Sequence, residues 1–143
     1  MVKAENMERL CQIPLEEVLP VIREPRSSRD RVKVNIRGYN LNAQSLRLRT
    51  FKHKGTTCSV CGLTASYFVI EKVKNSEEAP HLNLYGLKDG VEVLFTHDHT
   101  LARGLGGSNH ITNSEPMCGP CNWAKGLEEQ NQVLKLQGKW VKT

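Results

Sequence analysis

The sequence has few aromatic residues and no long apolar segment. Aromatic side chains make up 6% of its 143 residues and hydrophobic ones 38%, so the core they can build is thin. A small domain with little apolar burial is usually stabilised by disulfide bonds or by a structural metal ion. No apolar run approaches the roughly 20 residues of a membrane helix, and no charged-then-apolar signal peptide opens the chain. We therefore expect a cytoplasmic protein with no membrane partner, whose thiols are reduced.

Acidic residues are scarce in one segment. The whole chain has a formal net charge of +5. Between Arg23 and Lys54, however, ten basic residues stand against two acidic ones, so this segment is +8 and the remainder is −3. Such a run is often only a solvated surface, but its position directly before a candidate metal site favours an arm that contacts phosphates. The expected phosphate contacts lie on a helix predicted within this segment and are Arg47, Arg49, Lys52 and Lys54.

Local patterns divide the chain in two. The alternation of polar and apolar residues over 31–37 predicts a strand, and Asn42 is expected to cap a helix that ends near Lys54, before Gly55. This strand and helix form an N-terminal basic arm, residues 1–56, in which Pro14 allows only a short helix near residue 15. Residues 57–143 form the second domain, with strands expected at 67–73, 81–85, 91–97 and 115–118, and helices from about 120 and over 127–136. Residues 86–90 are expected to form a hairpin-like turn, for which Asp89-Gly90 is a strong signal.

Four of the five cysteines form two Cys-x-x-Cys pairs, Cys58/Cys61 and Cys118/Cys121, and Cys11 receives no role. Four thiolates are the ligand set of a tetrahedral structural zinc ion, and two intervening residues let one tight turn present both sulfurs. A zinc ion shared by the pairs would clamp two distant stretches, as a thin core requires. A redox dithiol is the alternative, but the βαβ context of a thioredoxin-type site is missing around the first pair.

A longer motif lies between and around these pairs. The chain reads Asp98-His99, then Gly106-Gly107, then Asn113, and closes with Cys-Gly-Pro-Cys-Asn-Trp-Ala-Lys-Gly over 118–126. In order and spacing, residues 58–126 resemble the HNH nuclease family, in the form whose ββα-metal core lies between two zinc knuckles. The resemblance implies an α+β fold stapled by a four-cysteine zinc site, and a metal-dependent endonuclease that hydrolyses phosphodiester bonds in DNA. Residues 100–102 depart from the family's pattern but remove no catalytic atom.

The resemblance also assigns roles to single residues. His99 would be the general base, because a neutral imidazole can deprotonate an attacking water near neutral pH. Asp98 and Asn122 would supply oxygen ligands to a catalytic Mg²⁺ or Mn²⁺ ion. Asn113 would hold the histidine-bearing strand in position. Two cations would touch phosphates, Arg103 and Lys125.

Several alternatives stay open. The first is a zinc-dependent nucleic-acid-binding module without catalysis, although a pure binder gains nothing from keeping the trio of Asp98, His99 and Asn122. His97 is expected to be structural or exposed rather than a third ligand, and His110 receives no role. Duplex and branched DNA, nicking and double-strand cleavage, and the oligomeric state are all left undecided. Small free-standing members of the family resemble phage-encoded enzymes, which act in the cytoplasm of an infected bacterium.

Overall fold

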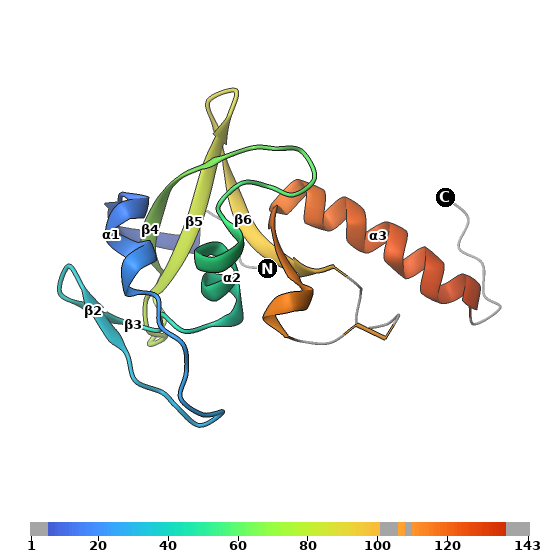
Figure 1. The fold of residues 1–143 in the computed structure, drawn as a ribbon. Coiled ribbons are helices and arrows are strands. Elements are labelled where there is room, and N and C mark those ends of the chain that lie inside the picture. The colour runs from blue at the N-terminus through green and yellow to red at the C-terminus, as the bar shows by residue number, and fades with distance from the viewer. Residues whose placement is uncertain (1–5, 101–105, 108–109, 137–143) are drawn as a thin grey trace.

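The computed structural model describes residues 6–100, 106–107 and 110–136, with side chains in the last stretch as far as residue 132. Over these residues the protein is a mixed α+β fold, as the sequence predicts (Figure 1). A five-stranded antiparallel sheet has the strand order β1-β4-β5-β6-β7, and β2 and β3 form a separate hairpin. The elements are β1 (Met7–Ile13), α1 (Leu15–Val18), the 3-10 helix η2 (Leu19–Val21), β2 (Val34–Ile36), β3 (Tyr39–Leu41), α2 (Leu46–Lys54), β4 (Ala65–Val73), β5 (His81–Lys88), β6 (Val91–His99), the 3-10 helix η4 (Ile111–Asn113), β7 (Ser114–Cys118) and α3 (Gly119–Leu136).

Strand β1, which the sequence analysis did not predict, lies at one edge of the large sheet. It pairs antiparallel with β4, with Ile13 opposite Phe68 and Met7 opposite Val73. Pro14 is the N-cap residue of α1, which is only four residues long, within the limit that the prolines set. Because β1 belongs to the same sheet as β4 to β7, the expected boundary at residue 56 does not separate two cores: the basic arm and the later residues fold together.

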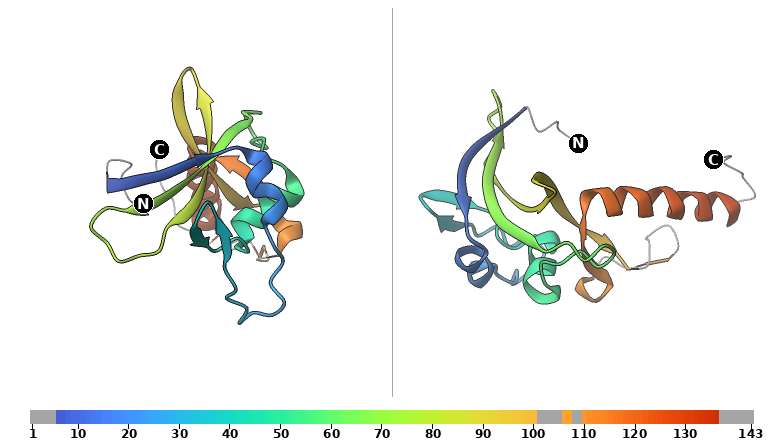
Figure 2. Two further views of the ribbon diagram at one scale, coloured as in Figure 1. Left: turned by 90° about the vertical axis from the view of Figure 1, so that its left-hand side faces the viewer. Right: turned by 90° about the horizontal axis from the view of Figure 1, so that it is seen from above.

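One face of the large sheet carries the main core, against which α1 and α2 pack (Figure 2). Phe51 of α2 meets Phe68 of β4 edge to face, with ring centroids 6.5 Å apart and an interplanar angle of 63°. Phe95 of β6 and Met117 of β7 are fully buried in the same cluster. This packing fixes α2 across the sheet and places its polar residues next to the ends of β6 and β7.

The helix of the basic arm begins later than expected. Ser45, not Asn42, is its N-cap: the Ser45 hydroxyl accepts a hydrogen bond from the backbone N–H of Leu48 at 3.2 Å. Asn42 instead closes a local turn, in which its Oδ1 accepts from the N–H of Gln44. The helix ends at Gly55, whose φ of 100° favours glycine, as predicted. The strand expected over 31–37 is reduced to β2, because its only partner is the three-residue β3.

The C-terminal half contains the hairpin and helix that position the candidate site. Asp89 and Gly90, both at positive φ, turn β5 into β6, as the Asp-Gly pair predicts. Strand β6 continues two residues beyond the expected end, to His99, and pairs with β7. A single helix, α3, stands where two were expected after residue 120, since it passes through Gly126 without a break. It projects from the sheet (Figure 1). In the described part of the chain, every helix is too short or too polar to cross a membrane.

Candidate functional site

The four paired cysteines come together in one cluster. Cys58 and Cys61 lie in the turn before β4, Cys118 ends β7, and Cys121 lies in the first turn of α3. The backbone N–H of Ser59 donates to the carbonyl of Pro116 at 3.0 Å, which fastens the first turn to β7. Cys58 and Cys118 are almost completely buried, whereas Cys61 is exposed. The cluster therefore joins the middle of the chain to the start of its last helix.

The sulfur positions match those of a tetrahedral metal site. All four Sγ atoms lie within 4.8 Å of one another, and those of Cys61 and Cys118 are 3.8 Å apart. A tetrahedral zinc site with Zn–S bonds of about 2.3 Å has sulfur–sulfur edges of about 3.8 Å. The cysteines are free thiols and not disulfides. The cluster could hold a metal ion such as zinc.

Local electrostatics prepare one of these thiols for ionisation. Burial opposes ionisation of the Cys58 thiol, but backbone N–H groups of Cys61, Cys118 and Val60 hydrogen-bond its sulfur, and its pKa falls to about 6. Burial raises the pKa of the Cys118 thiol to about 12, and the neighbouring sulfurs add to this rise. A cation at the centre of the cluster would offset the repulsion among thiolates, so metal binding and ionisation are coupled.

Strand β6 presents its last residues on two faces. Because side chains alternate along a strand, Thr96 and Asp98 point to one face and His97 and His99 to the other. The two imidazole rings lie 6.2 Å apart between centroids, as same-face neighbours should. Contacts made by α3, described next, fall on the face of Thr96 and Asp98. Asp98 and His99, adjacent in sequence, therefore flank the end of the strand from opposite sides.

Asn122 lies against β6 from the first turns of α3. Its Nδ2 donates to the hydroxyl of Thr96 at 2.5 Å and, more weakly, to the carbonyl of His97 at 3.5 Å. With the amide nitrogen used in this way, the Oδ1 oxygen of Asn122 is the atom left for a ligand. The structure thus places Asn122 on the same face of β6 as Asp98.

Lys125, one turn further along α3, lies among several oxygen atoms. Its Nζ donates to the carbonyl of His99 at 2.7 Å and lies 3.0 Å from the Asp98 carboxylate. Glu115 of β7 and Glu129 of α3 each place a carboxylate oxygen 3.3 Å away. Burial opposes the charge, but these carboxylates, Asp98 above all, hold the pKa of Lys125 above its ordinary value. Lys125 therefore ties α3 to the end of β6 and faces its own chain.

The Asp98 carboxylate is paired with a cation through one oxygen. Its Oδ2 atom is buried, and the ammonium of Lys125 lies 3.0 Å from it. A buried carboxylate oxygen without a hydrogen-bond donor is unfavourable unless a cation compensates it. Together with Oδ1 of Asn122, it offers the hard oxygen donors that Mg²⁺ and Mn²⁺ prefer. The chemistry of the donor pair fits such an ion.

The other predicted residues of this region take the following places. Asn113 ends η4, and its backbone carbonyl accepts a hydrogen bond from the N–H of Thr100 at 2.9 Å, directly after His99. This backbone contact holds the outgoing chain beside β7, and the positioning role expected of the Asn113 side chain stays a prediction. His110 caps η4 with its ring. Gly106 has a φ of 96°, and Arg103 lies outside the described residues.

The basic residues of α2 have different surroundings. Arg49 donates from Nε to the carbonyl of Gln44 and lies 3.6 Å from the carboxylate of Glu24. Lys52 donates to the carbonyl of Ile22 at 2.6 Å. These two cations therefore hold the preceding segment against the helix, whereas Lys54 is exposed at the helix end. Only part of the expected phosphate-contacting row is free of such internal bonds.

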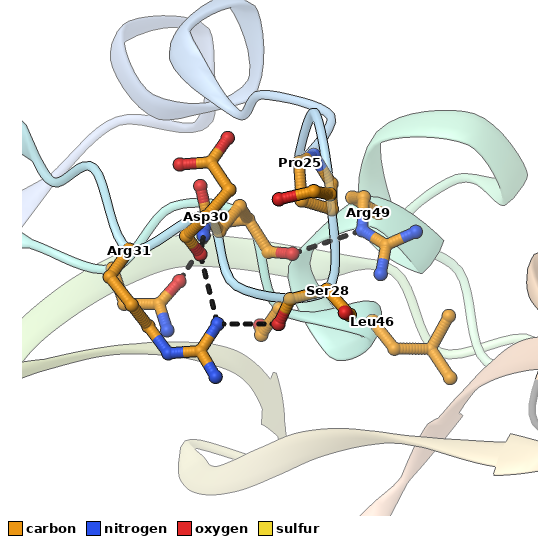
Figure 3. A pocket seen from close by; sticks show the side chains of 10 residues that line it. Pro25, Ser28, Asp30, Arg31, Leu46 and Arg49 are labelled. Carbon is orange, nitrogen blue, oxygen red and sulfur yellow. Dashed lines mark hydrogen bonds between the residues drawn. The ribbon is translucent and has the colours of Figure 1, made fainter.

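A hollow of about 290 Å³ opens between this helix and the segment before it (Figure 3). Arg31 and Arg49 lie in its wall, but Arg31 donates to the carbonyls of Ser28 and Asp30. Asp30 also lies in the wall, and its carboxylate pairs with Arg23 at 3.0 Å. The hydrogen bonds to Arg23 and to backbone N–H groups hold the pKa of Asp30 well below its usual range. The cations around this hollow are already satisfied by the protein.

Sequence reasoning missed several residues around the site. Glu115 and Glu129 surround Lys125, and Thr96 anchors Asn122. The spacing of Glu129, four residues after Lys125, is a detectable sign of a shared helix face. Thr96 could have been found from its alternation with Asp98 along the strand. Glu115 could not, since its place depends on the pairing of β6 with β7.

Comparisons with known proteins add no relative: family models, curated proteins and solved structures all give no match to this chain.

Proposed function

We propose that this chain is a zinc-stapled, metal-dependent endonuclease of the HNH type that hydrolyses phosphodiester bonds in DNA. The observation that carries the proposal is the arrangement at the end of β6. Asp98 and His99 finish the strand on its two faces, and Asn122 of α3 lies on the Asp98 side. The succession of β6, β7 and α3 is the strand–strand–helix order expected of a ββα-metal core.

Zinc is proposed to act as a structural ion. The four-sulfur cluster joins the turn before β4 to the junction of β7 and α3, and it lies at the start of the helix that carries Asn122. A four-thiolate site leaves no open coordination position for a substrate, in contrast to catalytic zinc sites. The ion would fix the angle at which α3 leaves the sheet, and so the distance between Asn122 and β6.

His99 is proposed to accept the proton of the attacking water. Its half-buried ring lies at the end of β6, on the face opposite Asp98. Because the two side chains approach the strand end from different sides, a phosphate bound there has the imidazole on one flank and the carboxylate on the other. The hydrogen bond from Thr100 to the carbonyl of Asn113 restrains the backbone next to His99. A restrained base loses less orientational freedom on reaching the transition state.

Asp98 and Asn122 are proposed to hold a catalytic Mg²⁺ or Mn²⁺ ion. Such an ion supplies Lewis-acid polarisation of the phosphate and stabilises the departing oxygen. The buried Oδ2 of Asp98 is now balanced by Lys125, so the ammonium must move away from Asp98 when the ion binds. Glu115 and Glu129 lie within 3.3 Å of the ammonium and can retain it after that movement.

Plasmid cleavage tests the proposal. Purified protein is incubated with supercoiled plasmid in Mg²⁺, in Mn²⁺ and with no added divalent metal, beside a His99→Ala variant. We expect nicked or linear plasmid with either metal and none without added metal. Loss of a general base lowers the rate by about 10²- to 10⁴-fold. His53→Ala is the matched control, because that histidine pairs with Glu24 away from the site and its loss should leave the rate unchanged.

Two results would contradict the proposal. Cleavage that persists in His99→Ala at the rate of the parent would remove His99 from the role of base. A protein that binds DNA, carries its zinc and never cuts, with either metal, would favour the alternative of a zinc-dependent binding module. Circular dichroism and zinc content establish that His99→Ala is folded.

A further inference from the structure

A second, smaller hollow lies between the start of α2 and the start of β5. It has a volume of about 110 Å³, enough for three or four water molecules at about 30 Å³ each. Arg47 lies in its wall and donates from Nη2 to the carbonyl of Leu82 at 2.7 Å. The rest of the lining consists of three polar residues, Asn42, Ser45 and His81, and two apolar ones, Leu48 and Leu82.

Arg47 combines burial with the lack of an anionic partner among the described residues. Arg23 pairs with Asp30, Arg37 with Glu17 and Arg49 with Glu24. Three further arginines of the basic arm form no ion pair with a described residue either, but they are exposed: Arg26, Arg29 and Arg31. Within the described residues, no carboxylate forms an ion pair with Arg47, and burial lowers the pKa of its guanidinium. Removing a cation from water without a neighbouring anion costs free energy, and an anionic ligand bound beside Arg47 would offset that cost.

Arg47 also lies near the proposed active site. Helix α2 packs against β6 and β7. Leu82, whose carbonyl accepts the hydrogen bond from Arg47, belongs to β5, the strand next to β6 in the sheet.

We infer that the hollow beside Arg47 binds one phosphate group of the DNA strand, next to the phosphate that is cut. The inference rests on the proposed function, which it extends from the catalytic residues to the position of the substrate. A guanidinium offers several N–H donors in a planar fork that matches phosphate oxygens. One donor is used by Leu82, and the hydroxyl of Ser45 and the side-chain amide of Asn42 lie in the same wall. The site reads the backbone and not the bases, so it contributes affinity and register.

A binding experiment without cleavage tests this inference. The His99→Ala protein, with no added Mg²⁺ or Mn²⁺, is titrated with a fluorescent DNA duplex over a range of salt concentrations. Adding Arg47→Gln should raise Kd about 10- to 100-fold, as loss of a charge-assisted contact does. The slope of log Kd against log salt should fall by about 0.9, the value for one phosphate. Lys88→Gln, on the exposed hairpin at the far end of β6, removes the same charge and should change neither quantity.

Neutral linkages identify the phosphate directly. Duplexes with a single methylphosphonate are scanned along each strand, and one position should weaken binding by the Arg47 protein but not by the Arg47→Gln protein. The sensitive position is detected with the Arg47 protein alone, so it does not depend on the folding of a variant. Arg47→Lys keeps the charge but not the planar fork of N–H donors, so it should retain the salt slope while losing affinity.

The outcomes separate this inference from the nuclease proposal. Equal Kd and salt slope in the Arg47→Gln and Lys88→Gln proteins would overturn the inference, even if the parent cuts DNA. A parent that binds no duplex at low salt would overturn it as well. An Arg47-dependent phosphate contact in a protein that never cuts, in contrast, would support the inference and contradict the nuclease.

Discussion

Breaking the four-sulfur cluster should destabilise the whole domain. The perturbation is Cys118→Ser, which removes a buried thiol at the junction of β7 and α3. An ion that binds only the folded state adds its binding free energy to folding. For zinc-finger peptides this is about 10–16 kcal/mol at pH 7, and a whole domain is stable by only about 5–15 kcal/mol. With zinc bound, the cluster would therefore contribute a large share of the stability of a chain with a thin core.

The expected size of the effect follows from these figures. If one missing thiolate removes about 5 kcal/mol, a third to a half of the zinc contribution, Tm falls by about 15 °C, since a domain of this size loses about 3 °C per kcal/mol. Circular dichroism at 222 nm measures the melting curve, and elemental analysis measures zinc per chain. A strong chelator added to the unmutated protein should reproduce the shift.

Cys11→Ser is the matched control for this experiment. Cys11 is a free cysteine on β1, outside the four-sulfur cluster, so the variant should keep one zinc per chain and its Tm. The reasoning is refuted if Cys118→Ser binds no zinc and melts at the temperature of the parent. It is also refuted if chelation removes the metal without lowering Tm.

Two further variants test other buried charges. Tyr85→Phe removes the hydroxyl that hydrogen-bonds the buried Glu71 carboxylate, one oxygen of which already has no partner among the described residues. Urea unfolding should show that the free energy of unfolding falls by about 1–3 kcal/mol. An unchanged midpoint would speak against that bond. Lys125→Met leaves three carboxylates without their shared cation and should cost about 1–3 kcal/mol at pH 7. Folding raises the pKa of Lys125, so its contribution to the free energy of unfolding is complete below about pH 10.4 and is lost as the pH rises through the raised value. A difference in stability between parent and variant that vanishes already at pH 8 would contradict this account.

The sequence allowed good prediction where the information is local. The Asp89-Gly90 turn, the strand character of β4 and β6, and the glycine that ends α2 all depend on a few neighbouring residues. Strand β1 was missed because its edge position is set by pairing with β4, far along the chain. The N-cap of α2 was assigned to Asn42 instead of Ser45, since both residue types favour that position and only the packing of the helix decides between them.

The same division applies to the candidate site. The two Cys-x-x-Cys pairs predict the four-sulfur cluster, because one ligand set for one ion requires both turns to meet. Composition could not tell which cations of the basic arm are free. Arg47, Arg49 and Lys52 lie on the same helix and each donates to a backbone carbonyl, but Arg49 is also paired with Glu24, and Lys52 binds the carbonyl of Ile22. That distinction depends on the path of residues 22–30 over α2, which no local pattern encodes.

The charges on the two sides of β6 bear on why cleavage should need a metal ion. On the α3 side, the carboxylates of Asp98, Glu115 and Glu129 surround a single ammonium, that of Lys125, which leaves two negative charges in excess. A phosphate approaching from that side meets repulsion unless a divalent cation balances the excess. On the α2 side, Arg47 has no anionic partner within the described residues. Under the proposed function, the DNA backbone therefore lies along the α2 side, the divalent ion enters from the α3 side, and the scissile phosphate at the end of β6 is the group that both can reach.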